Sequence, residues 1–291
     1  MANHTKPPAR RAAKDLHPMF RPKTRQTATN TALGQAELVF HTAVYSIRKS
    51  HGNAIYGLLI NIFQTMLMIG ILYALYEFLN LRRTAIRGNY ILYMMSGVFL
   101  FMCHVKTMGA VLKADGPTSP MMKHAPMNTL VSIAAAALGS LYTQVLTMVV
   151  VLYGVHVLIE PVSIDDPVGA MGMVMLCWIS GVAIGMVFRA ARPWHPEAMG
   201  VISAVYMRAN MIASGKMFVA NMMPGYILWL FDWNPLFHAI DQGRGFIFLN
   251  YFPHHSSISY PIWVTIACLM LGLIGEFYTR MHASISWTAG R

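Results

Sequence analysis

The sequence predicts an all-α integral membrane protein, and three observations support this prediction. Hydrophobic residues make up 56% of the 291 residues, and charged residues make up only 11%. A soluble domain carries about a quarter charged residues. Several apolar runs also reach the length of about 20 residues that a transmembrane helix needs. We therefore expect one membrane domain over residues 51–291, preceded by a short polar region.

The polar region has two predicted parts. Residues 1–30 are rich in Pro, Thr, Arg and Lys and show no hydrophobic periodicity, which is typical of a disordered cytoplasmic tail. In residues 31–50, apolar side chains from Leu33 to Ile47 recur at intervals of three and four, so they share one helix face. This pattern predicts an amphipathic helix on the membrane surface. An ordinary helix packed on protein remains an alternative.

Six transmembrane helices are expected in the rest of the chain. They are residues 54–79, 90–112, 129–159, 168–188, 197–218 and 260–280. Fifteen of the 22 Lys and Arg then fall in segments on the cytoplasmic side, and five fall outside. Basic residues are retained on the cytoplasmic side, so both termini are expected to be cytoplasmic.

The net charge of +11 does not predict nucleic-acid binding. Nine Lys and Arg precede the first span, where they can contact anionic lipid headgroups. The three cysteines lie inside apolar runs and provide no disulfide or metal framework. The adjacent pair His254 and His255 cannot share a helix face, so no metal site is expected.

Residues 217–259, between the last two spans, are too apolar for an external loop, yet proline and glycine interrupt them. A helix over residues 224–233 would be about 15 Å long, which is half of a bilayer. Asn234 is a suitable cap and Pro235 a suitable first residue for a second short helix. We therefore predict a re-entrant helical hairpin that dips into the outer side of the membrane.

The second short helix is expected to stop near Gly243. Asp241 and Arg244 are three residues apart and are expected to pair on its face. The polar residues would then face a cavity or a subunit contact. A membrane-surface loop with a local salt bridge is the alternative.

In this region the chain resembles a known family. The run MFVANMMPGYILWLFDWNPLFHAIDQGRGFIF resembles the carboxy-terminal signature of type-2 ABC exporter permeases, most closely the inner-membrane subunit of capsular-polysaccharide and O-antigen exporters. The matching residues are Trp233, Asn234, Pro235, Leu236, His238, Asp241 and Arg244. A second match is SPMMKHAPMNTLVSIAAAALGSL, and the likeness covers residues 33–286. Lys216, and Asp241 in place of the commoner Glu, depart from the pattern and leave the substrate open.

The resemblance implies a permease dimer that works with a dimer of ATPase subunits. The chain has no G-x-x-x-x-G-K-[ST] phosphate loop, so ATP would bind the partner and no cofactor would bind this chain. The ATPase would dock on the cytoplasmic segment 114–127, with the helix at residues 33–49 as a second contact. The expected docking residues are Pro117, Pro120, Lys123, His124 and Pro126. A plain turn between spans is the alternative.

A polysaccharide path should be lined with aromatic side chains, on which sugar rings stack. The residues expected to line this path are Tyr56, Phe63, Tyr73, Tyr206 and the mid-span cation Arg208. The residues expected to form an outer gate are Tyr226, Trp229, Trp233, Asn234, Pro235, Phe237, His238, Asp241 and Arg244. The aromatic residues among them also fit a lipid belt or a packed core.

The sequence thus predicts the permease subunit of an ABC exporter in the bacterial inner membrane, moving a lipid-linked cell-surface polysaccharide outward. Further expected partners are the lipid bilayer and periplasmic or outer-membrane export proteins. A drug or small-lipid exporter of the same fold is the first alternative. A membrane-bound acyltransferase that uses His and Asp, and a scaffold without transport activity, are the others.

Overall fold

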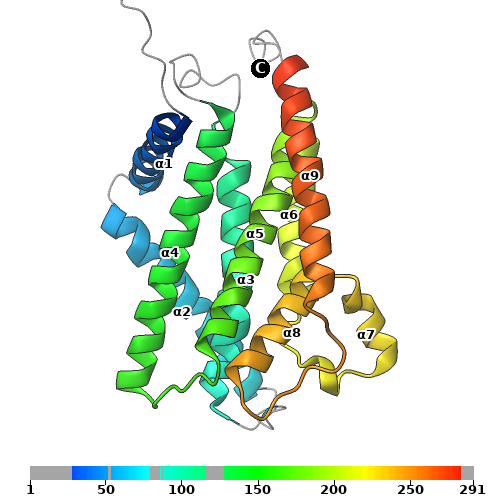
Figure 1. The fold of residues 1–291 in the computed structure, drawn as a ribbon. Coiled ribbons are helices and arrows are strands. Elements are labelled where there is room, and N and C mark those ends of the chain that lie inside the picture. The colour runs from blue at the N-terminus through cyan, green and yellow to red at the C-terminus, as the bar shows by residue number, and fades with distance from the viewer. Residues whose placement is uncertain (1–27, 52–53, 79–85, 87, 116–127, 283–291) are drawn as a thin grey trace, which may run out of the picture. The chain divides into compact units, whose positions relative to one another are not determined.

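The computed structural model describes residues 28–51, 54–78, 86, 88–115 and 128–282. Every regular element in these ranges is helical, which confirms the predicted all-α class. Contacts divide the chain into the units Met1–Leu38 and Val39–Arg291, and helices α2 to α9 belong to the second. The elements, labelled in Figure 1, are α1 Ala28–His51, α2 Ala54–Phe78, α3 Tyr90–Leu112, α4 Thr129–Leu158, α5 Pro167–Ala191, α6 Pro196–Ala213, the 3-10 turn Ala220–Met222, α7 Gly225–Asp232, α8 Pro235–Ile247 and α9 Ser259–His282.

Five of these helices are long and apolar enough to cross a membrane: α2, α3, α4, α5 and α9. They coincide with five of the six predicted spans, and for α3 both ends agree with the prediction. The five helices indicate a multi-pass membrane protein.

The remaining predicted span corresponds to α6, which is shorter than expected. It ends at Ala213 rather than near residue 218, because Gly215 has a φ of +69°. That left-handed conformation is the usual way a glycine ends a helix. α6 also carries Glu197 and Arg208 within its 18 residues, so it is less apolar than the other five.

The core of the second unit is built around α3. This helix packs against α2, α4, α5 and α8, and α5 packs in turn against α9. In the most apolar window of α3, 72% of the residues are buried, compared with 17% for α2. The exposed apolar face of α2 is therefore available to lipid or to another protein.

A buried ion pair joins α5 to α9. Arg189 Nη1 lies 2.9 Å from Glu276 Oε2, and both side chains are buried. The same guanidinium donates through Nη2 to Asp115 O at 2.6 Å and through Nε to Ala114 O at 3.4 Å, just after α3. Arg189 thus connects the ends of α3, α5 and α9.

Candidate functional site

Helices α7 and α8 meet at a sharp break, which Asn234 organises. Its side-chain oxygen accepts a hydrogen bond from the Leu236 amide at 3.0 Å and so caps α8, with Pro235 in the first turn. Its side-chain amide donates to Asn210 Oδ1 at 2.9 Å and to Ala213 O at 2.8 Å in α6. The predicted helix cap is confirmed, and the same residue fastens α8 to the end of α6.

Arg244 lies in the last turn of α8 and is completely buried. Its Nη1 donates to Gly215 O at 3.0 Å and to Phe218 O, and its Nη2 donates to Lys216 O at 2.6 Å. Its Cζ lies 4.4 Å from the centre of the Tyr93 ring. Burial of a charged group is costly unless such partners are present. Arg244 therefore holds the turn that follows α6.

That turn, residues 214–219, presents four consecutive carbonyl groups to side-chain donors. Three of them bind Arg244, and the fourth, Met217 O, accepts hydrogen bonds from the hydroxyls of Tyr76 and Tyr93. Buried backbone carbonyls outside regular structure need such partners. Since the donors come from α2, α3 and α8, the turn connects all three helices.

One face of α3 packs closely against this turn. Tyr93, Gly97 and Phe101 are spaced four residues apart, so they lie along one side of the helix. Lys216 Nζ lies 3.8 Å from the centre of the Phe101 ring, while Arg244 covers Tyr93. A Cβ atom on Gly97 would lie only 2.7 Å from Lys216 O and 2.8 Å from Arg244 Nη2. Gly97 therefore permits the close approach of the turn.

Lys216 is fully buried, and its Nζ has no hydrogen-bond partner among the described residues. Burial lowers the pKa of this ammonium group to about 8. The contact with the Phe101 ring offsets part of the cost of desolvation. Lys216 is thus a buried cation that packs against α3.

Asp241 on α8 binds the loop that follows this helix. Its carboxylate accepts hydrogen bonds from the Tyr251 hydroxyl and from Ser256 Oγ, the latter at 2.7 Å. Burial, together with the charge of Asp241, raises the pKa of Tyr251, so that hydroxyl remains a donor. Gln242 Nε2 also donates to Ser256 O at 2.7 Å. The loop over residues 248–258 is therefore fixed to α8.

Two expectations for α8 are wrong. No ion pair within the described ranges joins Asp241 to Arg244, because each side chain is bonded to other partners. Gly243 does not stop the helix, which continues to Ile247. A Cβ atom on Gly243 would lie 2.6 Å from Leu100 Cδ1. This glycine thus allows α8 to pack closely against α3.

The residues expected to form an outer gate fall into two groups. Tyr226, Trp229 and Trp233, on α7 and its end, are exposed. The others are on α8 or at its start, and of these the following are buried: Asn234, Phe237, His238, Asp241 and Arg244. The first group forms a surface, and the second holds α8 in place.

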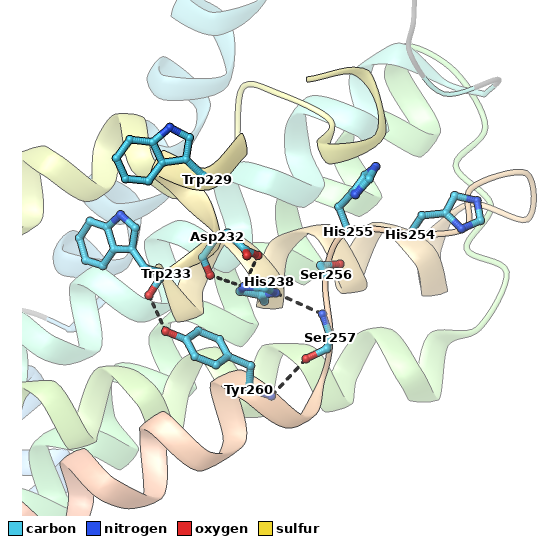
Figure 2. Close-up of a pocket in the computed structure, with 9 residues that line it drawn as sticks. All are labelled: Trp229, Asp232, Trp233, His238, His254, His255, Ser256, Ser257 and Tyr260. Carbon is cyan, nitrogen blue, oxygen red and sulfur yellow. Dashed lines mark hydrogen bonds and ion pairs between the residues drawn. The ribbon is translucent and has the colours of Figure 1, made fainter. Parts of the chain in front are cut away.

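A pocket of about 630 Å³ lies between α7, the start of α8, the loop before α9 and the first turn of α9. Figure 2 shows Trp229 and Trp233 on one side of it, with Asp232 and His238 in the middle. Residues 254–257 and Tyr260 complete the lining. Three of these side chains are aromatic rings and one is a carboxylate, so the pocket combines flat apolar surfaces with hydrogen-bond acceptors.

His238 joins the walls of this pocket. The Ser257 amide donates to Nδ1 at 3.1 Å, so Nδ1 is an acceptor and Nε2 carries the proton. Nε2 donates to Asp232 O at 2.6 Å and lies 3.3 Å from Asp232 Oδ1. The Tyr260 ring packs 4.8 Å from the imidazole, and its hydroxyl donates to Trp233 O at 2.7 Å. α7, α8 and α9 are thus linked around the pocket.

The residues expected to line a substrate path are spread over two helices with different neighbours. α6 packs on α5 and carries Arg208, which is exposed, and Tyr206, whose hydroxyl lies 3.1 Å from His104 Nε2. α2 packs on α3 and α4 and carries three exposed aromatic residues: Tyr56, Phe63 and Tyr73.

The residues expected to dock an ATPase fall outside the described residues. They are Pro117, Pro120, Lys123, His124 and Pro126. The described residues immediately before them, Ala114 and Asp115, are held by Arg189, as described above.

Sequence reasoning missed several residues of the network around the turn. Tyr76, Tyr93 and Gly97 contact the turn, and Arg189 pairs with Glu276. The four-residue spacing from Tyr93 through Gly97 to Phe101 was a usable signal, since it marks one helix face.

A comparison with protein-family models finds no match, and a comparison with curated proteins finds none either.

Proposed function

We propose that the chain is the membrane-spanning permease subunit of an ABC exporter that moves a cell-surface polysaccharide, carried on a lipid, out across the bacterial inner membrane. The observation that carries this proposal is the packing of the W-N-P-L-x-H segment. Asn234, His238, Asp241 and Arg244 are all buried. Asn234 is bonded to α6, Arg244 to the turn that follows α6, and both Asp241 and His238 to the loop before α9. A surface loop with a local salt bridge would leave these residues in solvent.

The proposed topology has six spans, with α6 as the fifth, and α1 as a surface helix. Asn234 and Asn210 bond to each other, so α6 and α8 move as one unit at that end. α7 carries exposed Tyr226, Trp229 and Trp233, which suit the boundary between lipid and water. Together α7 and α8 form the re-entrant hairpin. Its short non-helical turns are bonded to protein, as the membrane interior requires.

The substrate path runs between two copies of the chain. The aromatic residues on α2 and the exposed Arg208 on α6 lie on helices that pack on different neighbours, and a second copy supplies the other wall of the path. A charge within a span is costly in lipid, about 3 kcal/mol, so Arg208 faces the path or the other copy. There it attracts the phosphate groups of the lipid carrier.

Energy comes from a separate ATPase subunit that docks on residues 114–127. Arg189 binds the backbone at the start of this segment and pairs with Glu276 on α9. A movement of the segment is therefore passed directly to α5 and α9. The external loops contact periplasmic or outer-membrane export proteins.

Deletion of the gene, followed by analysis of surface glycans, tests the proposal. We expect the polymer to be synthesised but to accumulate inside the cell. Complementation with Arg208→Ala should reproduce the accumulation, and Arg208→Lys should restore most of the export. Normal surface polymer in the deletion strain would contradict the function. A change in drug sensitivity or lipid composition, without a change in surface polymer, would favour the drug or small-lipid exporter.

A further inference from the structure

The pocket beside α7 has the chemistry of a carbohydrate-binding site. Trp229 and Trp233 are four residues apart at the end of α7, so they lie on the same side, as Figure 2 shows. Their side chains are 67% and 66% exposed although both line the pocket. Two wide, flat rings beside each other offer the surface on which the C–H faces of sugar rings stack.

The polar groups of the pocket discriminate between sugars by charge. Asp232 lines it and is the one carboxylate among the described residues of the lining, and its side chain is 58% exposed. Among the described residues, the lining includes no Lys or Arg, and its basic side chains are the histidines His238, His254 and His255. A carboxylate accepts hydrogen bonds from hydroxyl groups and attracts ammonium groups, but it repels another carboxylate. His238 is held by Ser257 and the Asp232 backbone, and its Nε2 lies 3.3 Å from Asp232 Oδ1, so the imidazole keeps this carboxylate at the pocket.

We propose that this pocket binds a short stretch of pyranose units that are uncharged or carry an amine, and that it disfavours uronic acids. This inference rests on the proposed function and specifies the substrate class of the same exporter. The volume of about 630 Å³ lies within the range of about 300–1,000 Å³ that is usual for small-molecule sites. Trp229 and Trp233 stack on the sugar rings, and Asp232 accepts hydrogen bonds from their hydroxyl groups.

Tryptophan at a membrane boundary has another common role, as part of an aromatic belt. Trp263, on α9, separates the two roles. Its side chain is 69% exposed, which matches the two pocket residues, but it does not line the pocket. If the tryptophans serve only as an aromatic belt, replacing any of the three should have the same effect on sugar binding. If the pocket is a sugar site, replacing Trp263 should leave sugar binding unchanged.

The test uses the full chain in phosphatidylcholine nanodiscs, because glycoside detergents present sugar headgroups that would occupy the pocket. Intrinsic tryptophan fluorescence is followed during titration with maltopentaose, with a chitosan pentamer and with a galacturonic-acid pentamer. We expect saturable binding of the first two, and at least tenfold weaker binding of the uronate. Trp229→Ala and Trp233→Ala should each weaken binding tenfold or more, and Trp263→Ala should stay within twofold of wild type. Asp232→Asn should remove the discrimination against the uronate.

The inference is overturned if no saccharide gives a saturable change, if the uronate binds as well as maltopentaose, or if Trp263→Ala weakens binding as much as the pocket variants do. The failures of the two proposals are distinguishable. Sugar binding by the protein, together with normal surface polymer in the deletion strain, would contradict the exporter function but would still support the sugar-binding site. An export defect without sugar binding would remove only the site.

Discussion

Replacing Gly97 with Ala perturbs the place where α3 meets the turn after α6. The new Cβ atom would lie 2.7 Å from Lys216 O, 2.8 Å from Arg244 Nη2 and 3.0 Å from Lys216 Cα. Two of these three atoms belong to the backbone, and the third belongs to a guanidinium fixed by three hydrogen bonds. None of them can move aside without losing contacts.

The expected magnitude is the sum of two opposing effects. Alanine is favoured over glycine within a helix by about 0.8–1 kcal/mol. Overpacking of a well-packed site costs about 1–3 kcal/mol, and each lost hydrogen bond to a charged group adds about 1.5–3 kcal/mol. We therefore expect Gly97→Ala to lower the free energy of unfolding by about 2 kcal/mol or more.

Gly109→Ala is the matched control, because Gly109 lies on the same helix and a Cβ atom there would meet nothing within 4 Å. This variant should be as stable as wild type or gain up to about 1 kcal/mol. Thermal unfolding of the full chain in nanodiscs, followed by tryptophan fluorescence, compares the two. If Gly97→Ala is as stable as Gly109→Ala, the close approach is not a constraint. In the double variant of Gly97→Ala and Arg244→Met, the two losses in unfolding free energy should not be additive. Additive losses would likewise contradict a contact shared by the two residues.

Three further predictions use the same unfolding measurement. Arg189→Met should cost about 3–5 kcal/mol by leaving Glu276 buried and unpaired, and adding Glu276→Leu should restore most of the loss. Lys216→Met should stabilise the protein at pH 7 by about 1–3 kcal/mol. The pKa of Lys216 is about 8 in the folded protein and about 10.4 in the unfolded chain, so the unfolded chain binds more protons between these pH values. The free energy of unfolding of the wild type therefore rises from about pH 8 to pH 10, and the stability difference between Lys216→Met and wild type should become smaller by pH 10. Asn234→Ala should cost about 1–2 kcal/mol through loss of the α8 cap, and an unchanged midpoint would contradict that role.

The helices could be predicted from the sequence because their signals are local. Apolar runs of the required length mark α2 to α5 and α9, and Asn234-Pro235 marks the start of α8. Each of these signals depends on residues that are close together in the chain. The end of α6 was predicted too late because Gly215 was placed inside the span. A glycine in the left-handed conformation, as Gly215 is, commonly ends a helix.

The interactions around the turn could not be predicted, because they depend on contacts between distant residues. Arg244 was expected to pair with the nearby Asp241, yet it binds carbonyl groups 26 to 29 residues earlier. A guanidinium has five donors, and one carboxylate three residues away satisfies few of them. Gly243 looked like a helix stop, but its role depends on the neighbouring Leu100 side chain. Such choices follow from the tertiary packing.

The turn after α6 also constrains how the protein is made. Its carbonyl groups receive their hydrogen bonds from α2 and α3, which are synthesised earlier, and from α8, which is synthesised later. While the ribosome has not yet reached Arg244, the nascent chain lacks the donor for three of these carbonyl groups, and buried backbone carbonyls need such partners. Chains that are truncated before α8 should therefore be degraded quickly by membrane proteases. Chains that extend beyond α8 should be stable.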